Sequence, residues 1–211
     1  MPFGSAAFVF CLVRKERIFK MEDRKNRQKQ DIRKIALCAI MIALGTVLSL
    51  IKIYEPPLGG GVTVLSMVPV AFLSCMLGLK WGFGASFVYA LIQLYLSFGE
   101  VMSWGLTAGV VVATLLFDYL VPYTLLGICG ILRKKGVWGI VTGVAIGLTL
   151  RFLCHFFTGF YIFDIWCPWG NVWVYSLAYN AGYMLPEIIL TCVGTALLCR
   201  SRAIKRLVVE A

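Results

Sequence analysis

Long apolar stretches separated by short polar segments set the strongest limit on what this chain folds into. A helix that rises ~1.5 Å per residue needs about 20 apolar residues to cross about 30 Å of hydrocarbon. Charged residues make up 14% of the sequence and hydrophobic residues 60%, which excludes an ordinary soluble domain. Pro69 falls inside the second stretch, so a kinked or broken helix is expected there. We therefore expect an all-α, polytopic membrane protein with six transmembrane helices in residues 35–53, 62–79, 81–98, 103–132, 137–163 and 172–199.

The distribution of basic residues predicts the orientation of these helices. Every Lys and Arg except Lys52 and Arg151 lies before residue 35, at Lys80, in residues 133–135 or after residue 199. Short cytoplasmic loops are enriched in Lys and Arg, so both termini are predicted to be on the cytoplasmic side of a cell membrane. The loops predicted on the other side contain no Lys or Arg, and they are residues 54–61, 99–102 and 164–171.

Three regions follow from this reading. Residues 1–34 form a basic cytoplasmic leader, residues 35–199 the membrane domain, and residues 200–211 a basic cytoplasmic tail. Because Met21 begins a more ordinary basic leader, we interpret residues 1–20 as an overlong start. The net charge of +10 would suggest nucleic acid in a soluble protein. Here the basic residues flank membrane helices, so we expect lipid as the partner and no nucleic acid.

Four ionisable side chains lie inside the predicted helices, namely Asp118, Arg151, His155 and Glu187. Such residues cost several kcal/mol in hydrocarbon and usually face a partner, a ligand or the bundle interior. Arg151 and His155 are four residues apart and share one helix face. We expect a structural role for Arg151, paired with Glu187 or with helix-end carbonyls, and we assign no role to Glu187.

Counting along the predicted helices places several polar and aromatic side chains at a similar depth near the outside. His155, Tyr175 and Asn180 fall at one level, with Asp118 somewhat deeper. A carboxylate among aromatic rings suits an organic cation, while an amide and a phenol can read the donors and acceptors of a heterocycle. We therefore predict a cavity for an organic cation that is open to the outside, with Trp104, Trp166, Trp169 and Trp173 near its level.

Catalysis is the competing class of function, and the sequence offers it little. It has no HExxH, no GxSxG and no P-loop. A single His cannot build a histidine-rich metal site, and the eight Cys residues form no CxxC pair. We expect no metal, no cofactor and no enzymatic activity, with an intramembrane hydrolase as the alternative.

Several blocks together resemble the S-components of energy-coupling factor (ECF) vitamin transporters, specifically the thiamine-binding ThiT family. The resemblance covers roughly residues 35–198 and rests on GGGVTVLSMVP, LLFDYLVPYTLLGICGI, RFLCHFFTG, WVYSLAYN and YMLPE. It implies a six-helix subunit that captures thiamine from outside with high affinity. It also implies partners, namely a transmembrane T-component and two ABC ATPases that use ATP. The alternative is an S-component for another small heterocyclic vitamin or a thiamine precursor.

The resemblance also implies site residues. Asp118 matches the acidic position that faces the ligand, and Tyr119, His155, Tyr175 and Asn180 match further ligand-contacting positions. Where the family often has a Trp eight residues after the histidine, this chain has Phe163. Either Phe163 or Trp166 then stacks on the ligand, and the sequence does not choose between them.

Other positions bear on a lid and on a partner. Tryptophans of some family members align near Gly60 and Gln93, and we group both with Trp104 as lid or pocket residues. The glycines at 59–61 give the first outer loop the freedom to fold over a ligand. On the first helix, Ala39 and Ala43 match the small-residue motif through which S-components pack against the T-component.

Overall fold

The computed structural model describes the backbone of residues 4–56 and 59–202, with side chains at residue 17 and, within these ranges, from residue 19 onward. The parts of the leader and tail in residues 1–3 and 203–211 therefore lie outside the description. The chain divides into two compact units, one ending at Leu37 and the other beginning at Cys38. Helix α1 (Gly4–Ser49) contains the described part of the first unit and continues into the second. The second unit, called the membrane unit below, carries the cavity.

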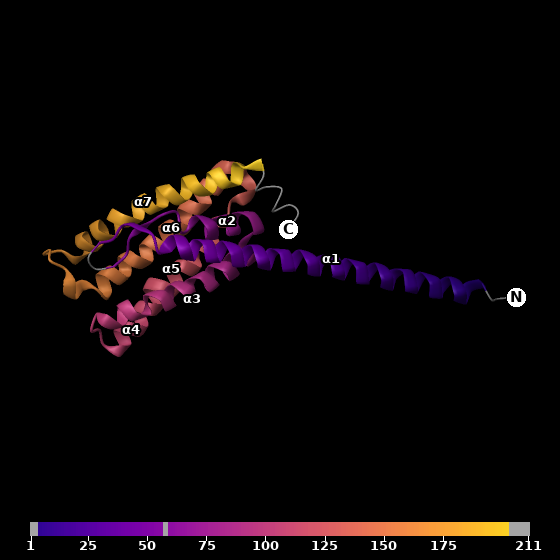
Figure 1. Ribbon diagram of the computed structural model, residues 1–211, viewed down its shortest axis with the longest axis horizontal. Coiled ribbons are helices and arrows are strands. Elements are labelled where there is room, and N and C mark those ends of the chain that lie inside the picture. Colours follow the sequence, from indigo (N-terminus) through magenta and orange to yellow (C-terminus); the bar gives the residue numbers. More distant parts are fainter. Residues whose placement is uncertain (1–3, 57–58, 203–211) are drawn as a thin grey trace. The chain divides into compact units, whose positions relative to one another are not determined.

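The prediction of an all-helical membrane protein is confirmed. In the described part of the chain, the helices long and apolar enough to cross a membrane are Phe19–Ser49, Leu79–Ser103, Ala108–Gly130, Arg133–Tyr161 and Val172–Arg200. A shorter apolar helix, α2 (Val68–Leu77), stands where the second span was expected. Figure 1 shows α6 (Gly136–Tyr161) and α7 (Val172–Arg200) side by side within the membrane unit.

The second predicted span starts later than the sequence suggested. Strand β2 (Val62–Thr63) pairs antiparallel with β1 (Lys52–Tyr54), so residues 62–67 are strand and turn instead of helix. Helix α2 then begins with Pro69 in its first turn. A proline there loses no helical hydrogen bond, because the first N–H groups of a helix have no partner inside it. The proline therefore starts the helix and does not kink it.

The fourth span is helical throughout but irregular. Helix α3 (Leu79–Ser103) includes residues 99–102, which were expected to be a loop, so the connection is residues 104–107 instead. Then α4 (Ala108–Thr114), a π-helical turn η1 (Leu115–Leu120), α5 (Val121–Thr124) and the 3₁₀ segment η2 (Leu125–Gly130) follow without a break. The short segments η3 (Arg133–Lys135) and η4 (Asp164–Trp166) flank α6.

Glycines let α6 approach η2 closely. A Cβ at Gly139 would lie 2.3 Å from the Leu132 oxygen, and one at Gly143 would lie 2.4 Å from the Cys129 oxygen. Small residues at spacings of four allow such backbone contact between membrane helices. The glycine face of α6 therefore sets the position of the fourth span, which carries Asp118.

Glu187 holds the hairpin against α7. Its side chain is fully buried and accepts hydrogen bonds from the Thr63 N–H (2.9 Å) and the Thr63 hydroxyl (2.8 Å). A buried carboxylate needs such partners, and these two come from β2. The expected pairing of Arg151 with Glu187 is wrong, because no ion pair joins them in the described structure. Glu187 instead fixes one wall of the cavity described next.

Candidate ligand-binding site

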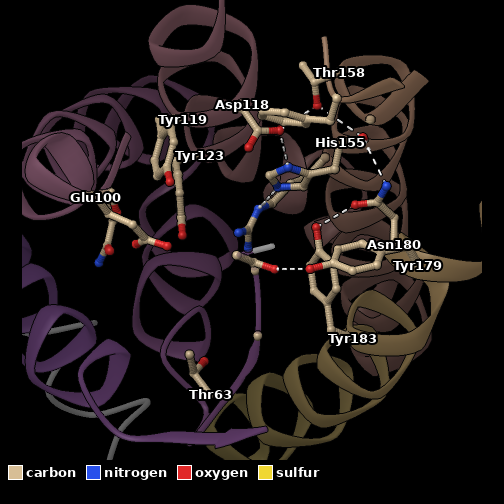
Figure 2. Close-up of a pocket in the computed structure, with 18 of the residues that line it drawn as sticks. Thr63, Glu100, Asp118, Tyr119, Tyr123, His155, Thr158, Tyr179, Asn180 and Tyr183 are labelled. Atoms are coloured by element: carbon tan, nitrogen blue, oxygen red, sulfur yellow. Dashed lines mark hydrogen bonds and ion pairs between the residues drawn. The ribbon is translucent and has the colours of Figure 1, made fainter. Parts of the chain in front are cut away.

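A cavity of about 130 Å³, lined by both polar and aromatic side chains, lies in the membrane unit at the end that carries the β1–β2 hairpin (Figure 2). Its walls come from the end of α1, the hairpin, the turn before α2, and α3, η1, α5, α6 and α7. Trp166 is absent from the lining, although it was predicted at the site. The other predicted ligand-contacting and lid residues all line this cavity, namely Gly60, Gln93, Trp104, Asp118, Tyr119, His155, Phe163, Tyr175 and Asn180.

Asp118 lies in the π-helical turn η1, a local departure from the α-helix of a kind frequent at functional sites. Its Oδ1 atom accepts a hydrogen bond from the Thr158 hydroxyl (2.6 Å) and lies 2.7 Å from His155 Nδ1. The side chain keeps 16% of its surface exposed. The hydrogen bonds from described residues all reach Oδ1, which leaves Oδ2 available to a ligand.

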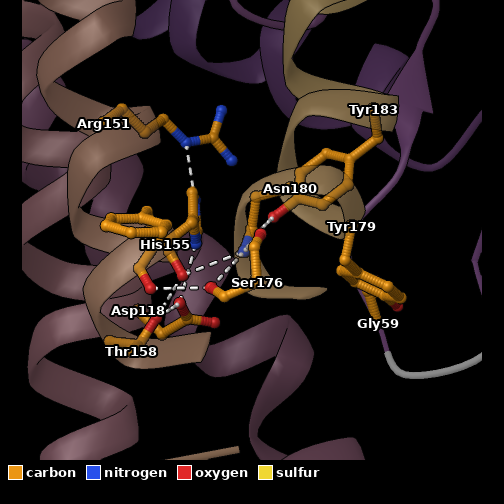
Figure 3. A network of polar contacts seen from close by, with 10 residues as sticks. Gly59, Asp118, Arg151, His155, Thr158, Ser176, Tyr179, Asn180 and Tyr183 are labelled. Atoms are coloured by element: carbon orange, nitrogen blue, oxygen red, sulfur yellow. Dashed lines mark hydrogen bonds and ion pairs between the residues drawn. The ribbon is translucent and has the colours of Figure 1, made fainter. Parts of the chain in front are cut away.

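The proton on His155 can be placed from the polarity of its neighbours (Figure 3). Arg151 Nε lies 3.2 Å from His155 Nε2, and a guanidinium only donates, so Nε2 accepts. In neutral imidazole the other nitrogen then carries the proton, so Nδ1 donates to Asp118 Oδ1. His155 is thus a neutral bridge between an anion and a cation.

Arg151 lines the cavity and also donates a hydrogen bond to His155. Its guanidinium carbon lies 4.1 Å from the centroid of the Tyr123 ring, and Nη1 contacts Met67 Sδ. The positive charge is therefore held beside the ring and at His155. This changes the reason why Asp118 is tolerated in the membrane: its charge is balanced through His155 by Arg151 before any ligand binds.

Helix α7 presents a polar and aromatic face to the cavity. Tyr175, Tyr179 and Tyr183 lie four residues apart on this face, as helical periodicity requires. The Tyr183 hydroxyl donates to Asn180 Oδ1 (2.6 Å), while Asn180 Nδ2 donates to the His155 carbonyl (3.2 Å). These bonds fix which end of the Asn180 amide is the acceptor, so the site is ordered on this side before a ligand enters.

The glycine loop of the hairpin lies against the same face. The Tyr179 hydroxyl donates to the Gly59 carbonyl (2.9 Å). Gly60 has φ +81°, and a Cβ there would lie 2.8 Å from the Tyr183 ring. The tryptophan that some family members carry near this position has no room in this conformation, because Tyr183 occupies the space.

Three aromatic rings stand beside one another at the end of α3. Trp104 and Phe163 line the cavity with their rings perpendicular and 5.6 Å apart. Trp166 stacks on Phe163 at 5.6 Å and 17°, outside the lining. The geometry thus favours Phe163 over Trp166 as the ring presented to a ligand.

Sequence reasoning missed several lining residues. Thr158 follows His155 by three positions, and Tyr179 and Tyr183 continue the spacing of Tyr175, so helical periodicity could have found them. Gln93 does line the cavity, and its Nε2 also donates to Ser49 Oγ (2.9 Å), which ties α3 to α1. No comparable signal in the sequence pointed to the lining residues from the hairpin and from the turn before α2, which are Lys52, Thr63, Ser66 and Met67.

The fold and the cavity define a helical membrane protein with an internal cavity lined by polar and aromatic side chains, and the described residues contain no cluster of potential metal ligands. Comparison with known proteins makes this class specific. The chain belongs to the thiamine transporter protein family (Thia_YuaJ), whose profile matches residues 35–207. With five apolar spans among the described residues, it is a multi-pass protein of the cell membrane.

Individual relatives agree with this assignment. The thiamine transporter ThiT of Bacillus subtilis is 31% identical over 188 residues, which cover 82% of this chain and 93% of the relative. ThiT of Lacticaseibacillus paracasei is 30% identical over 147 residues, or 63% of this chain and 70% of the relative. The solved structure of ThiT from Listeria monocytogenes shares the fold, with a TM-score of 0.66 at 17% identity, over 83% of this chain and 96% of that one.

Proposed function

We propose that this protein is the thiamine-binding S-component of an ECF importer. It captures thiamine from outside with high affinity and releases it inward when docked to a T-component and two ABC ATPases. The observation that carries the proposal is the free Oδ2 of Asp118 at the cavity, in a chain of the thiamine transporter family. ATP hydrolysis belongs to the partners, and the chain itself catalyses no reaction.

The cavity residues suit the two rings of thiamine. Its aminopyrimidine ring offers an amine donor beside ring-nitrogen acceptors, and its thiazolium ring carries a positive charge. Asp118 Oδ2 accepts from the amine, and the Tyr175 hydroxyl donates to a ring nitrogen, since the Tyr179 and Tyr183 hydroxyls already donate to Gly59 and Asn180. His155, Thr158 and Asn180 are already hydrogen-bonded without a ligand. Little conformational entropy of these side chains is therefore lost when the ligand binds.

Closure and docking use other elements. The glycine loop at 59–61 covers the ligand and excludes water, which strengthens the contact with Asp118. Ala39 and Ala43 lie exposed on one face of α1 within the membrane unit. Two small residues four apart permit close approach of another membrane helix, and we assign this face to the T-component.

The test is a titration of the purified full-length protein with thiamine, followed by tryptophan fluorescence. Trp104 lines the cavity and Trp166 is stacked one ring away, so binding is expected to quench the emission and to saturate at or below micromolar thiamine. Saturation by another vitamin, without saturation by micromolar thiamine, would refute the proposal.

A second candidate keeps the class and changes the ligand. Some family members have tryptophan near Gly60 and Gln93, and the family often has it at Phe163, so the aromatic surface around the ligand is smaller here. An S-component for a thiamine precursor, such as the pyrimidine moiety alone, would fit that change. Competition between thiamine and the free aminopyrimidine alcohol in the same titration decides between them.

A further inference from the structure

We infer that Glu100 is the counter-charge for the cationic ring of the ligand, and that Asp118 forms a hydrogen bond with the uncharged ring. The inference rests on the proposed function and extends it. It assigns the two halves of the ligand to two different carboxylates at separate places in one cavity. Figure 2 shows Glu100 across the cavity from Asn180 and Tyr183.

The charges that line the cavity lead to this assignment. Lys52 is paired with Glu55 on the hairpin. Asp118 and Arg151 are joined through the neutral His155, so their charges offset each other. Glu100 forms no ion pair with any residue that the structure describes. The cavity therefore carries one unmatched negative charge, which suits a ligand with one permanent positive charge.

The position of Glu100 on α3 directs it to the cavity. Gln93, Ser97, Glu100 and Trp104 follow one another at spacings of four, three and four residues, and all of them line the cavity. These spacings place them on one helix face. Glu100 is therefore part of a continuous stripe of lining residues and not an isolated surface acid.

The surroundings of Glu100 suit a flat cation. Measured from the position of a Cβ on Gly59, the Glu100 carboxylate lies at 3.6 Å and the Trp104 ring at 3.4 Å. Phe163 stands perpendicular to Trp104, so the two rings form an aromatic corner beside the carboxylate. Ion pairing and cation–π attraction then act on the same ring. The glycine loop lies next to this corner, and its closure removes water that would screen the charge pair.

Two ligands that differ only in charge test the assignment. The full-length protein is titrated with thiamine and with its neutral analogue, in which a thiophene ring replaces the thiazolium ring. We expect Glu100→Gln to weaken thiamine binding by about threefold to tenfold, and to change binding of the neutral analogue by less than about twofold. Asp118→Asn is expected to weaken both ligands, because it acts on the ring that they share.

The matched control is Asp164→Asn, which removes an exposed carboxylate of η4 that does not line the cavity. It should leave both affinities within about twofold, as expected for an exposed charge without a direct contact. Equal weakening of both ligands by Glu100→Gln, or no weakening of thiamine, would overturn the assignment. Failure of the unmodified protein to bind thiamine at all would instead overturn the proposed function.

Discussion

The single hydrogen-bond chain from Arg151 through His155 to Asp118 determines what the site offers a ligand. Since Arg151 can only donate, each bond in the chain has one direction, and the proton of His155 points to Asp118 Oδ1. Thr158 donates to the same oxygen. One carboxylate oxygen thus bonds to two protein partners, and the other remains available to accept from a ligand.

Asp118→Asn tests whether the two oxygens of this carboxylate have these different roles. An amide with its oxygen at the Oδ1 position keeps the bonds from His155 and Thr158, but it replaces the ligand-facing acceptor with a donor. We expect thiamine affinity to fall by about 1–3 kcal/mol, or roughly 5- to 150-fold in Kd, measured by fluorescence titration.

Thr158→Val is the comparison for Asp118→Asn. It removes one bond to Oδ1 and leaves the charge of Asp118 intact, so a smaller loss of about 1 kcal/mol is expected. An Asp118→Asn protein that binds thiamine as well as the unmodified protein would show that Oδ2 makes no contact with the ligand.

Helix packing positions the hydrogen-bonded residues Arg151, His155 and Asp118, and this packing depends on glycines. Gly139, Gly143 and Gly147 on α6 lie against the segment from Leu125 to Leu132, which directly follows η1 and α5 in the chain. Thr158 and His155 lie further along the same helix. A displaced α6–η2 contact would therefore also separate Asp118 from its partners.

Gly143→Ala should lower the stability of the folded protein by about 1–3 kcal/mol, because the added methyl would overlap the Cys129 carbonyl. The matched control is Gly182→Ala in α7, where nothing lies within 4 Å of the added Cβ. That change should be neutral or stabilising by up to about 1 kcal/mol, since alanine favours a helix over glycine. Thermal unfolding in detergent, followed by fluorescence, measures both. Equal melting temperatures for the two variants would contradict the proposed packing role.

At the scale of the whole molecule, we propose that the cavity binds thiamine while one face of α1 docks to the T-component. Substitutions on α1 can test this. Ala43 is exposed, while Gly45 two residues later is buried, with its Cβ position 2.9 Å from the Ser66 carbonyl. The helix thus has one face for the bundle and another that is free to meet a partner or lipid.

We expect Ala43→Trp to reduce thiamine uptake by cells that contain the T-component and ATPases by about tenfold or more, because a bulky ring prevents close helix approach. Thiamine binding by the purified variant should be unchanged. Ile146→Trp adds the same ring to an exposed position of α6 and should leave uptake normal. Normal uptake with Ala43→Trp would remove this face from the proposed interface.

Much of the fold was predictable because its causes act locally along the chain. Hydrocarbon thickness sets the length of an apolar helix, and the cost of a buried charge makes Asp118 and His155 conspicuous. Helical spacing then places such residues at comparable depths. The start of α2 was predicted wrongly, since an apolar segment such as residues 62–67 reads the same whether it forms a helix or a strand.

The sequence by itself determined the membrane class, the order of the helices and a central group of cavity residues that includes Asp118, His155 and Asn180. Only the tertiary structure decided that Glu187 holds Thr63, that Arg151 balances Asp118 through His155, and that Phe163 and not Trp166 faces the cavity. The physical reason is distance along the chain. A buried polar group must find a partner, but which partner it finds depends on how segments far apart in sequence pack together.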